Sequence, residues 1–130
     1  MELVDFLRAR LDEDEAAARG LLDDKRPGRA ERWKFCDDGA IRDTGRGRSL
    51  RVKFTWAPEA DHIARHDPAR VLAEVDAKRR LLAIHRPYVD ESDQACLGCA
   101  GGIMFSSCPV VRLLALPYAD HPDHREDWRP

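Results

Sequence analysis

The chain has 130 residues, 43% of them hydrophobic and 35% charged, and its net charge is near −2. That length suits one domain with a modest core, and the net charge gives no sign of overall attraction to nucleic acid or an anionic membrane. No segment approaches the roughly 18 uncharged apolar residues of a membrane span, and the first 11 residues lack the apolar core of a signal peptide. We therefore expect a cytoplasmic protein, in which four cysteines indicate a metal or free thiols rather than disulfides.

The first expected element is an amphipathic helix over residues 2–19. Its apolar residues follow the spacing of three and four that places side chains on one helical face, and Gly20 suits the end of the helix. A charged stretch that contains proline, residues 23–31, is predicted to be a loop.

Residues 32–56 show a different pattern, which predicts an antiparallel β-hairpin or small meander. Apolar side chains alternate with basic ones around Trp33 and again from Leu50 to Trp56, with glycine-containing turns between them. We expect Phe54 and Trp56 on an apolar face that the first helix covers.

The other face of this β element is expected to be basic and exposed. Residues 25–54 carry a net charge of +6, and the cations assigned to this face and its turn are Arg32, Lys34, Arg46, Arg48, Arg51 and Lys53. Such a hairpin could contact phosphates, which makes nucleic-acid binding one alternative function. The other interpretation is an ordinary solvated sheet face, with the aromatic side chains in the core on the opposite side.

A long central helix is predicted after Pro58. Asp67 followed by Pro68 is a typical helix start, with an acceptor side chain at the N-cap and proline at the first helical position. The helix should continue to about His85, because Pro87 ends it. A glycine-rich loop over residues 87–107 then leads to a short final helix that begins at Pro109.

Three cysteines in this last part of the chain predict a zinc site. Cys96 and Cys99 form a CxxC pair in the glycine-rich loop, and Cys108 stands before Pro109, where a helix N-terminus favours a thiolate. The fourth ligand is expected to be His85, with His121 and His124 as competitors. Buried free thiols and a redox pair of Cys96 and Cys99 are the alternatives, and Cys36 is expected to lie apart in a strand.

The histidines His62 and His66 share a helical face and offer a second alternative. With Asp120 and His121 they could form a metal-dependent hydrolytic centre. Because Asp67 already has a role as a helix cap, structural hydrogen bonding is the favoured interpretation, and we assign no catalytic residue.

The segments DHIARHDPARVLAEVDAKRRLL and CPVVRLLALPYADHPDHREDW resemble an uncharacterised family of small actinobacterial and actinophage proteins. The resemblance extends over residues 57–130, loosely over residues 1–11, and only slightly over residues 20–56. It implies a cytoplasmic bacterial or phage-derived protein, and it implies no activity. Family members keep a histidine at the position of His85, which favours this residue as the fourth ligand.

Together these observations predict one α+β domain over residues 1–130. Residues 1–56 would supply a helix and the β element, and residues 57–130 the central helix, the zinc loop and the final helix. The leading function is a zinc-stabilised binding or regulatory module, without catalysis and with a protein partner. The alternatives are a nucleic-acid-binding protein that uses the basic hairpin and a hydrolase centred on His62, His66 and His121.

Overall fold

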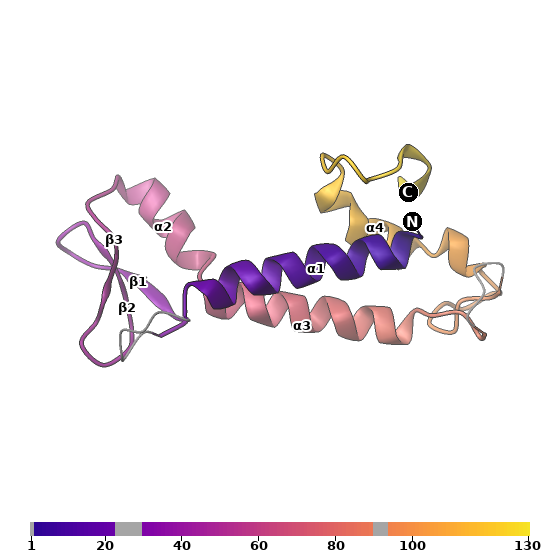
Figure 1. Cartoon of the computed structure of the whole chain (residues 1–130), viewed down its shortest axis with the longest axis horizontal. Coiled ribbons are helices and arrows are strands. Elements are labelled where there is room, and N and C mark those ends of the chain that lie inside the picture. The colour runs from indigo at the N-terminus through magenta and orange to yellow at the C-terminus, as the bar shows by residue number, and fades with distance from the viewer. Residues whose placement is uncertain (1, 23–29, 90–93) are drawn as a thin grey trace. The chain divides into compact units, whose positions relative to one another are not determined.

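The computed structural model describes residues 2–22, 30–89 and 94–130 and has the predicted α+β fold (Figure 1). Its helices and strands are α1 (Leu3–Gly20), β1 (Trp33–Phe35), β2 (Ile41–Asp43), β3 (Leu50–Val52), α2 (Ala57–Arg65), α3 (Pro68–Ile84) and α4 (Pro109–Ala115). Short 3-10 helices cover Phe105–Ser107, Leu116–Tyr118 and Glu126–Trp128. Most of the loop predicted over residues 23–31 lies outside the described residues. Among the helices described, none has the length and apolar character needed to cross a membrane.

Contacts within the chain define two compact units. One contains residues 1–12 and 76–130, and the other contains residues 13–75. The division differs from the expected one at residue 56, because α2 and the first part of α3 belong with the sheet. The single domain over residues 1–130 stays a prediction.

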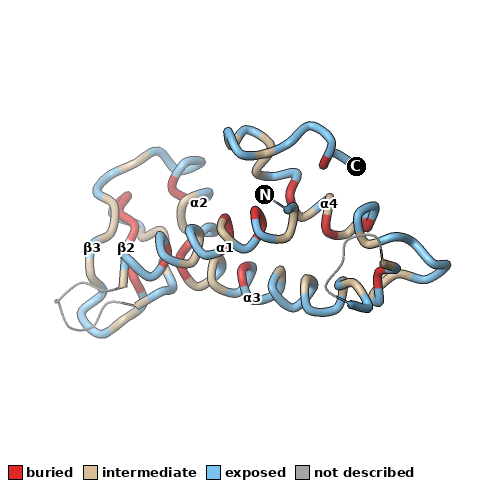
Figure 2. The backbone as a smooth tube through the Cα atoms, turned by 45° about the vertical axis from the view of Figure 1, so that its right-hand side comes forward, coloured by how far each residue is buried: buried red, intermediate tan, exposed pale blue. Residues whose placement is uncertain are grey.

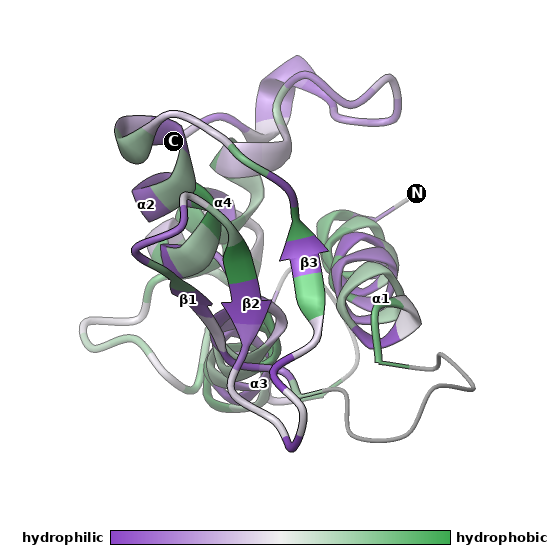
Figure 3. Cartoon of the chain, turned by 90° about the vertical axis from the view of Figure 1, so that its left-hand side faces the viewer, coloured by the Kyte–Doolittle hydropathy of each residue, from purple (hydrophilic) through white to green (hydrophobic). Residues whose placement is uncertain are grey.

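The unit of residues 13–75 contains a three-stranded antiparallel sheet in the order β1-β2-β3 (Figure 3). Ile41 is fully buried, and β1 packs against α2, in which Ala60 is buried. The meander is therefore confirmed, but the helix in closest contact with the sheet is α2 and not the first helix.

The predicted positions of two aromatic residues are wrong. Phe54 and Trp56 are 72% and 74% exposed, and their rings contact each other edge to face with centroids 6.2 Å apart. The reason is the end of β3 at Val52: the alternation of the sequence continues beyond the strand, while Trp56 already occupies the N-cap position of α2. Alternation places side chains on one sheet face only where the backbone is still a strand.

Arg51 does not lie on an exposed basic face, which corrects a second expectation. Its side chain is 3% exposed and forms an ion pair with the buried Asp43, Arg51 Nη2 lying 3.0 Å from Asp43 Oδ2. The guanidinium also lies over the ring of Trp33, 5.5 Å from the centroid. Asp43 further accepts hydrogen bonds from the backbone N–H groups of Gly45 and Ser49. Together these contacts join β2, β3 and the turn between them.

Asp67 has the capping role that the sequence predicted. Its Oδ1 accepts the backbone N–H of Arg70 at 2.9 Å, which caps α3, and its Oδ2 accepts the N–H of Trp33 at 3.0 Å. The same buried carboxylate thus fixes the start of a helix and the start of β1.

The unit of residues 1–12 and 76–130 has its core between the first part of α1, α4 and the C-terminal segment. The core consists of the buried residues Phe6, Leu7, Cys96, Cys108, Val111, Ala115 and Trp128. Figure 2 shows buried positions on α1, on α4 and near the C-terminus. The beginning of α1 lies beside the end of α3, and Arg79 of α3 pairs with Asp12 of α1 at 2.7 Å. The C-terminal segment returns to α1, where Trp128 packs on Phe6 with ring centroids 5.2 Å apart.

Candidate metal centre

His85 and Cys108 are placed by the ends of two helices. His85 follows the last residue of α3, and its backbone N–H still donates to Leu81 O at 2.8 Å, so the helical hydrogen bonding fixes its position. Cys108 is the N-cap residue of α4, as predicted, and Pro109 begins the helix. Both side chains therefore come from rigid elements of the same unit.

The other two cysteines lie on a short hairpin. Cys96 N–H donates to Ile103 O at 2.8 Å, and Phe105 N–H donates to Gln94 O at 2.7 Å. Between these bonds the chain turns tightly, with Cys99 N–H within 3.3 Å of Cys96 O. Leu97 N–H donates to Arg86 O at 2.9 Å, which attaches the hairpin to the segment that follows α3. The turn thus brings both CxxC sulfurs next to His85.

The four side chains have the mutual distances of a tetrahedral metal site. His85 Nδ1 lies 3.6 Å from the Sγ of Cys96 and 3.5 Å from the Sγ of Cys99 and of Cys108. Cys108 Sγ lies 3.7 Å from Cys96 Sγ and 3.6 Å from Cys99 Sγ. Zinc bonds are about 2.3 Å long to sulfur and about 2.05 Å long to nitrogen. In an ideal tetrahedron these bonds place two sulfurs about 3.8 Å apart and a sulfur and a nitrogen about 3.6 Å apart. All four ligand atoms lie within 4.8 Å of one another, so these residues could hold a metal ion.

Burial disfavours the thiolate form of the cysteines in this cluster unless a cation is near. Desolvation by burial, followed by hydrogen bonds with Cys108 and Cys96, raises the pKa of Cys99 from its ordinary 9.0 to about 12. At neutral pH a thiolate at Cys99 therefore needs a nearby positive charge. A divalent metal supplies that charge, and its binding would release the proton of Cys99.

Gly98, inside the CxxC pair, is required by the imidazole of His85. A Cβ atom at this position would stand 2.7 Å from His85 Nδ1 and 2.8 Å from His85 Cγ, which is too close for any side chain. This role of Gly98 was not predicted from the sequence. The signal was the glycine between the two cysteines, because a ligand ring can approach the backbone closely only where no side chain is present.

The two competing histidines pack against Phe6 of the same unit instead. The ring of His121 lies 5.6 Å and that of His124 lies 5.7 Å from the ring of Phe6, both edge to face. His121 Nδ1 is 3.1 Å from Arg10 Nη1 and accepts the backbone N–H of Asp123 at the same distance. Arginine can only donate hydrogen bonds, so His121 Nδ1 is the ring nitrogen that carries a lone pair. That lone pair already accepts the contacts from Arg10 and Asp123. The aromatic packing of the tail thus accounts for both residues.

The histidines of the hydrolase alternative are divided between the two units of the chain. His62 and His66 belong to one unit and His121 to the other. The rings of His62 and His66 stack with centroids 4.3 Å apart, and His66 Nδ1 contacts His62 O at 2.8 Å. In the described part of the chain, three or more metal-ligating side chains come together only at His85 and the three cysteines.

The cations predicted for the basic face of the hairpin are exposed, with one exception. Arg32, Lys34, Arg46, Arg48 and Lys53 are exposed, and Arg48 also donates to Cys36 Sγ at 3.4 Å, whereas the side chain of Arg51 is buried with Asp43. Cys36 belongs to the unit of the sheet and is not a member of the candidate metal cluster, but β1 ends at Phe35, so its predicted place in a strand is wrong. The predicted exposure of these cations is therefore wrong only for Arg51.

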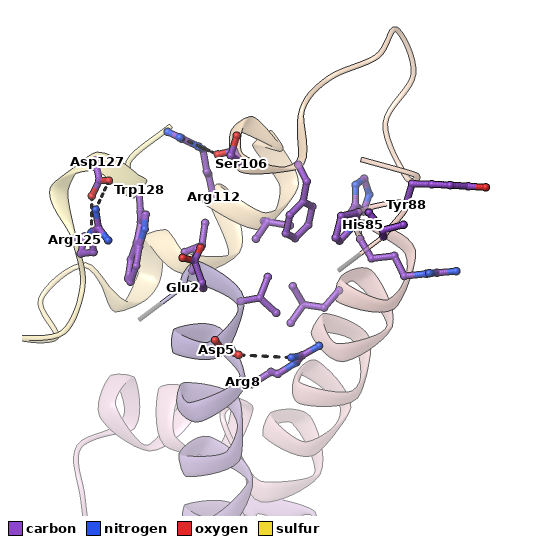
Figure 4. Close-up of a pocket in the computed structure, with 18 residues that line it drawn as sticks. Glu2, Asp5, Arg8, His85, Tyr88, Ser106, Arg112, Arg125, Asp127 and Trp128 are labelled. Carbon is purple, nitrogen blue, oxygen red and sulfur yellow. Dashed lines mark hydrogen bonds and ion pairs between the residues drawn. The ribbon is translucent and has the colours of Figure 1, made fainter. Parts of the chain in front are cut away.

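A pocket of about 990 Å³ opens beside the candidate metal centre (Figure 4). His85 and Tyr88 lie on one side of it and Trp128 on the other, and its apolar lining includes Leu3, Val4, Leu82, Phe105 and Val111. The charged groups at the pocket are largely paired with neighbours: Arg112 donates to Ser106 O at 3.0 Å, and Arg125 pairs with Asp127 at 2.8 Å.

The fold and the cluster define a small α+β protein with a candidate metal centre of one histidine and three cysteines. The chain belongs to the family of unknown function DUF6221, whose family model matches residues 1–130. The resemblance to an uncharacterised family is thus confirmed and includes the β element, while the bacterial or phage source stays an expectation. Neither a curated protein nor a solved structure gives a significant match.

Proposed function

We propose that this protein is a zinc-stabilised binding or regulatory module of the cytoplasm. The observation that supports it is the tetrahedral spacing of His85 Nδ1 and three cysteine sulfurs. Thiolate and imidazole ligands in a tetrahedral set favour zinc over oxygen-preferring cations such as magnesium and calcium. Four protein ligands fill the coordination sphere and leave no position for water or substrate, which is typical of a structural site.

The proposed zinc would cross-link elements that are far apart in the sequence. His85 ends α3, Cys96 and Cys99 belong to the hairpin, and Cys108 begins α4. Cys96 and Cys108 are also members of the buried core. In a small unit the free energy of metal binding contributes directly to the free energy of folding. We infer that zinc holds the walls of the neighbouring pocket, which is the surface that we assign to a protein partner.

Replacing His85 with alanine tests this proposal. The variant should lose zinc and most of the metal-linked stability of its unit, which amounts to about 10 kcal/mol in small zinc domains. Elemental analysis of protein purified without chelator should find about one zinc per chain in the wild type and none in His85→Ala.

His124→Ala and His62→Ala are the matched controls, because one removes a partly buried ring that packs on Phe6 outside the cluster and the other removes an exposed ring. Both variants should retain zinc, although His124→Ala should be less stable than the wild type. Wild-type protein without zinc, or zinc retained by His85→Ala, would contradict the proposal.

A second candidate function is the binding of single-stranded nucleic acid by the unit of the sheet. The observation that favours it is the exposure of Phe54 and Trp56 next to Lys53, since neighbouring exposed rings can stack with bases and a lysine can contact phosphate. The aromatic and basic groups, expected on opposite faces, therefore lie in one exposed stretch of the chain.

Fluorescence anisotropy with a labelled oligothymidylate measures this second function. Trp56→Ala should weaken binding about tenfold, the effect of losing one stacked base. Tyr88→Ala is the matched control, because Tyr88 is an equally exposed ring in the other unit. Salt-insensitive binding, or an equal effect of both variants, would exclude this candidate.

A further inference from the structure

The three cysteines of the candidate metal centre differ in how far each residue is buried. Cys96 is 3% exposed and Cys108 is fully buried, and both pack in the core of their unit. Cys99 is only partly buried and lies at the edge of that core. A small reagent that approaches from water therefore meets residue Cys99 before the two buried cysteines.

The backbone next to Cys99 has the conformation of a glycine turn. The residues that follow it, Ala100 to Gly102, are exposed, and Gly101 and Gly102 have φ angles of +78° and +70°. Glycine adopts such angles without strain and has more accessible conformations than any other residue. Cys99 is thus attached to a backbone that can rearrange, while Cys108 is held at the start of α4.

Cys108 is placed to react with an oxidised Cys99. The two sulfurs lie 3.6 Å apart. A disulfide bond of about 2.05 Å requires an approach of about 1.5 Å. The glycine turn on the side of Cys99 can supply a movement of this size.

We propose that Cys99 is an oxidation site for peroxides and that its disulfide with Cys108 releases the metal, an inference that rests on the proposed zinc site. The Cys99 thiolate attacks one oxygen of hydrogen peroxide, the O–O bond breaks, and sulfenic acid and hydroxide form. The Cys108 thiolate then attacks the Cys99 sulfur and displaces a second hydroxide. Two thiolates lose one electron each, the peroxide gains both, and two protons from solvent convert the hydroxides into water.

Loss of these two ligands leaves only His85 and Cys96 for the metal. Two protein ligands do not satisfy the tetrahedral preference of zinc, so the ion dissociates. The end of α3, the hairpin and α4 then lose their common cross-link, and the wall of the pocket at His85 and Tyr88 is no longer fixed. The oxidised protein should therefore have a less ordered pocket and a weaker interaction with its partner.

The test is a titration of the zinc-loaded full chain with hydrogen peroxide, with zinc release followed by a chromogenic chelator. We expect loss of about one zinc per chain, one equivalent of peroxide consumed for each zinc, and recovery after reductant and zinc are added. Dimedone present during limited oxidation should label Cys99, and peptide mapping without dimedone should find the Cys99–Cys108 disulfide. Cys36→Ser is the control, because it removes the cysteine outside the centre and should release zinc as the wild type does.

Zinc that stays bound while only Cys36 is oxidised would overturn the inference and leave the zinc site intact. Dimedone labelling of Cys96 or Cys108 in place of Cys99, or a Cys96–Cys99 disulfide, would overturn the assignment of the two sulfurs. A reduced wild-type protein that holds no zinc would instead refute the proposed function itself.

Discussion

At Gly98 the imidazole of His85 lies against the backbone, in the space that any side chain would occupy. A single methyl group there would push Nδ1 away from three sulfurs that now lie 3.5 to 3.6 Å from it. The ligand geometry thus depends on a residue that donates nothing to the metal. Residues that orient a ligand can matter nearly as much to a metal site as the ligands.

We predict that Gly98→Ala lowers zinc affinity by roughly tenfold or more, the size of effect seen when support of a ligand is lost. Competition with a chromogenic chelator measures this change. Gly20→Ala is the control, because a Cβ atom at Gly20 would meet nothing within 4 Å, and its zinc affinity should equal that of the wild type. Unchanged affinity in Gly98→Ala would show that His85 does not bind through the nitrogen assigned here.

At the scale of elements, the three short strands depend on one buried ion pair. Each strand has three residues, so the ladder provides few hydrogen bonds, and Asp43 and Arg51 link β2 to β3 through their side chains. A charge buried without its partner is strongly unfavourable, because it has lost its hydration. The pair is therefore costly to break, whatever its net contribution to stability.

Arg51→Met should destabilise the unit of the sheet by about 3–5 kcal/mol, because it leaves the Asp43 carboxylate buried without its cation. Lys53→Met is the matched control, since Lys53 is exposed two residues further along the chain, and its effect should stay within about 0.5 kcal/mol. Urea unfolding of both variants measures the difference. Equal stability of the two variants would mean that Arg51 is exposed in solution.

At the scale of the whole molecule, the four proposed metal ligands all belong to one of the two units. Removing zinc with a chelator should therefore raise amide hydrogen exchange most in residues 76–89 and 94–130. Exchange of β1, β2 and β3 should change least, because the links of the sheet are Asp43, Arg51 and Asp67 and not a metal. Exchange mass spectrometry before and after chelation provides the measurement. A uniform increase over both units would indicate that the chain unfolds as one cooperative domain.

Much of the molecule follows from features that are local in the sequence. The apolar period of α1, the Asp67-Pro68 start of α3 and the proline at the start of α4 predict helices, and the structure contains them. The CxxC pair, Cys108 and His85 were also identifiable, because each is a residue type with known metal chemistry at a helix end or in a turn. Helix caps, periodicity and turns depend on neighbours a few residues apart, so the sequence alone determines them.

Other features depend on partners that are distant in the sequence. The sequence could not show that Arg51 is buried against Asp43, that Phe54 and Trp56 remain exposed, or that Trp128 packs on Phe6. Which histidine lies beside the three cysteines was likewise decided by long-range packing, because the C-terminal segment places His121 and His124 against Phe6. Burial and pairing of these side chains are set by long-range contacts. The sequence therefore determined which elements and ligand types exist, and only the tertiary structure decided which side chains meet, because no local pattern encodes the packing of distant segments.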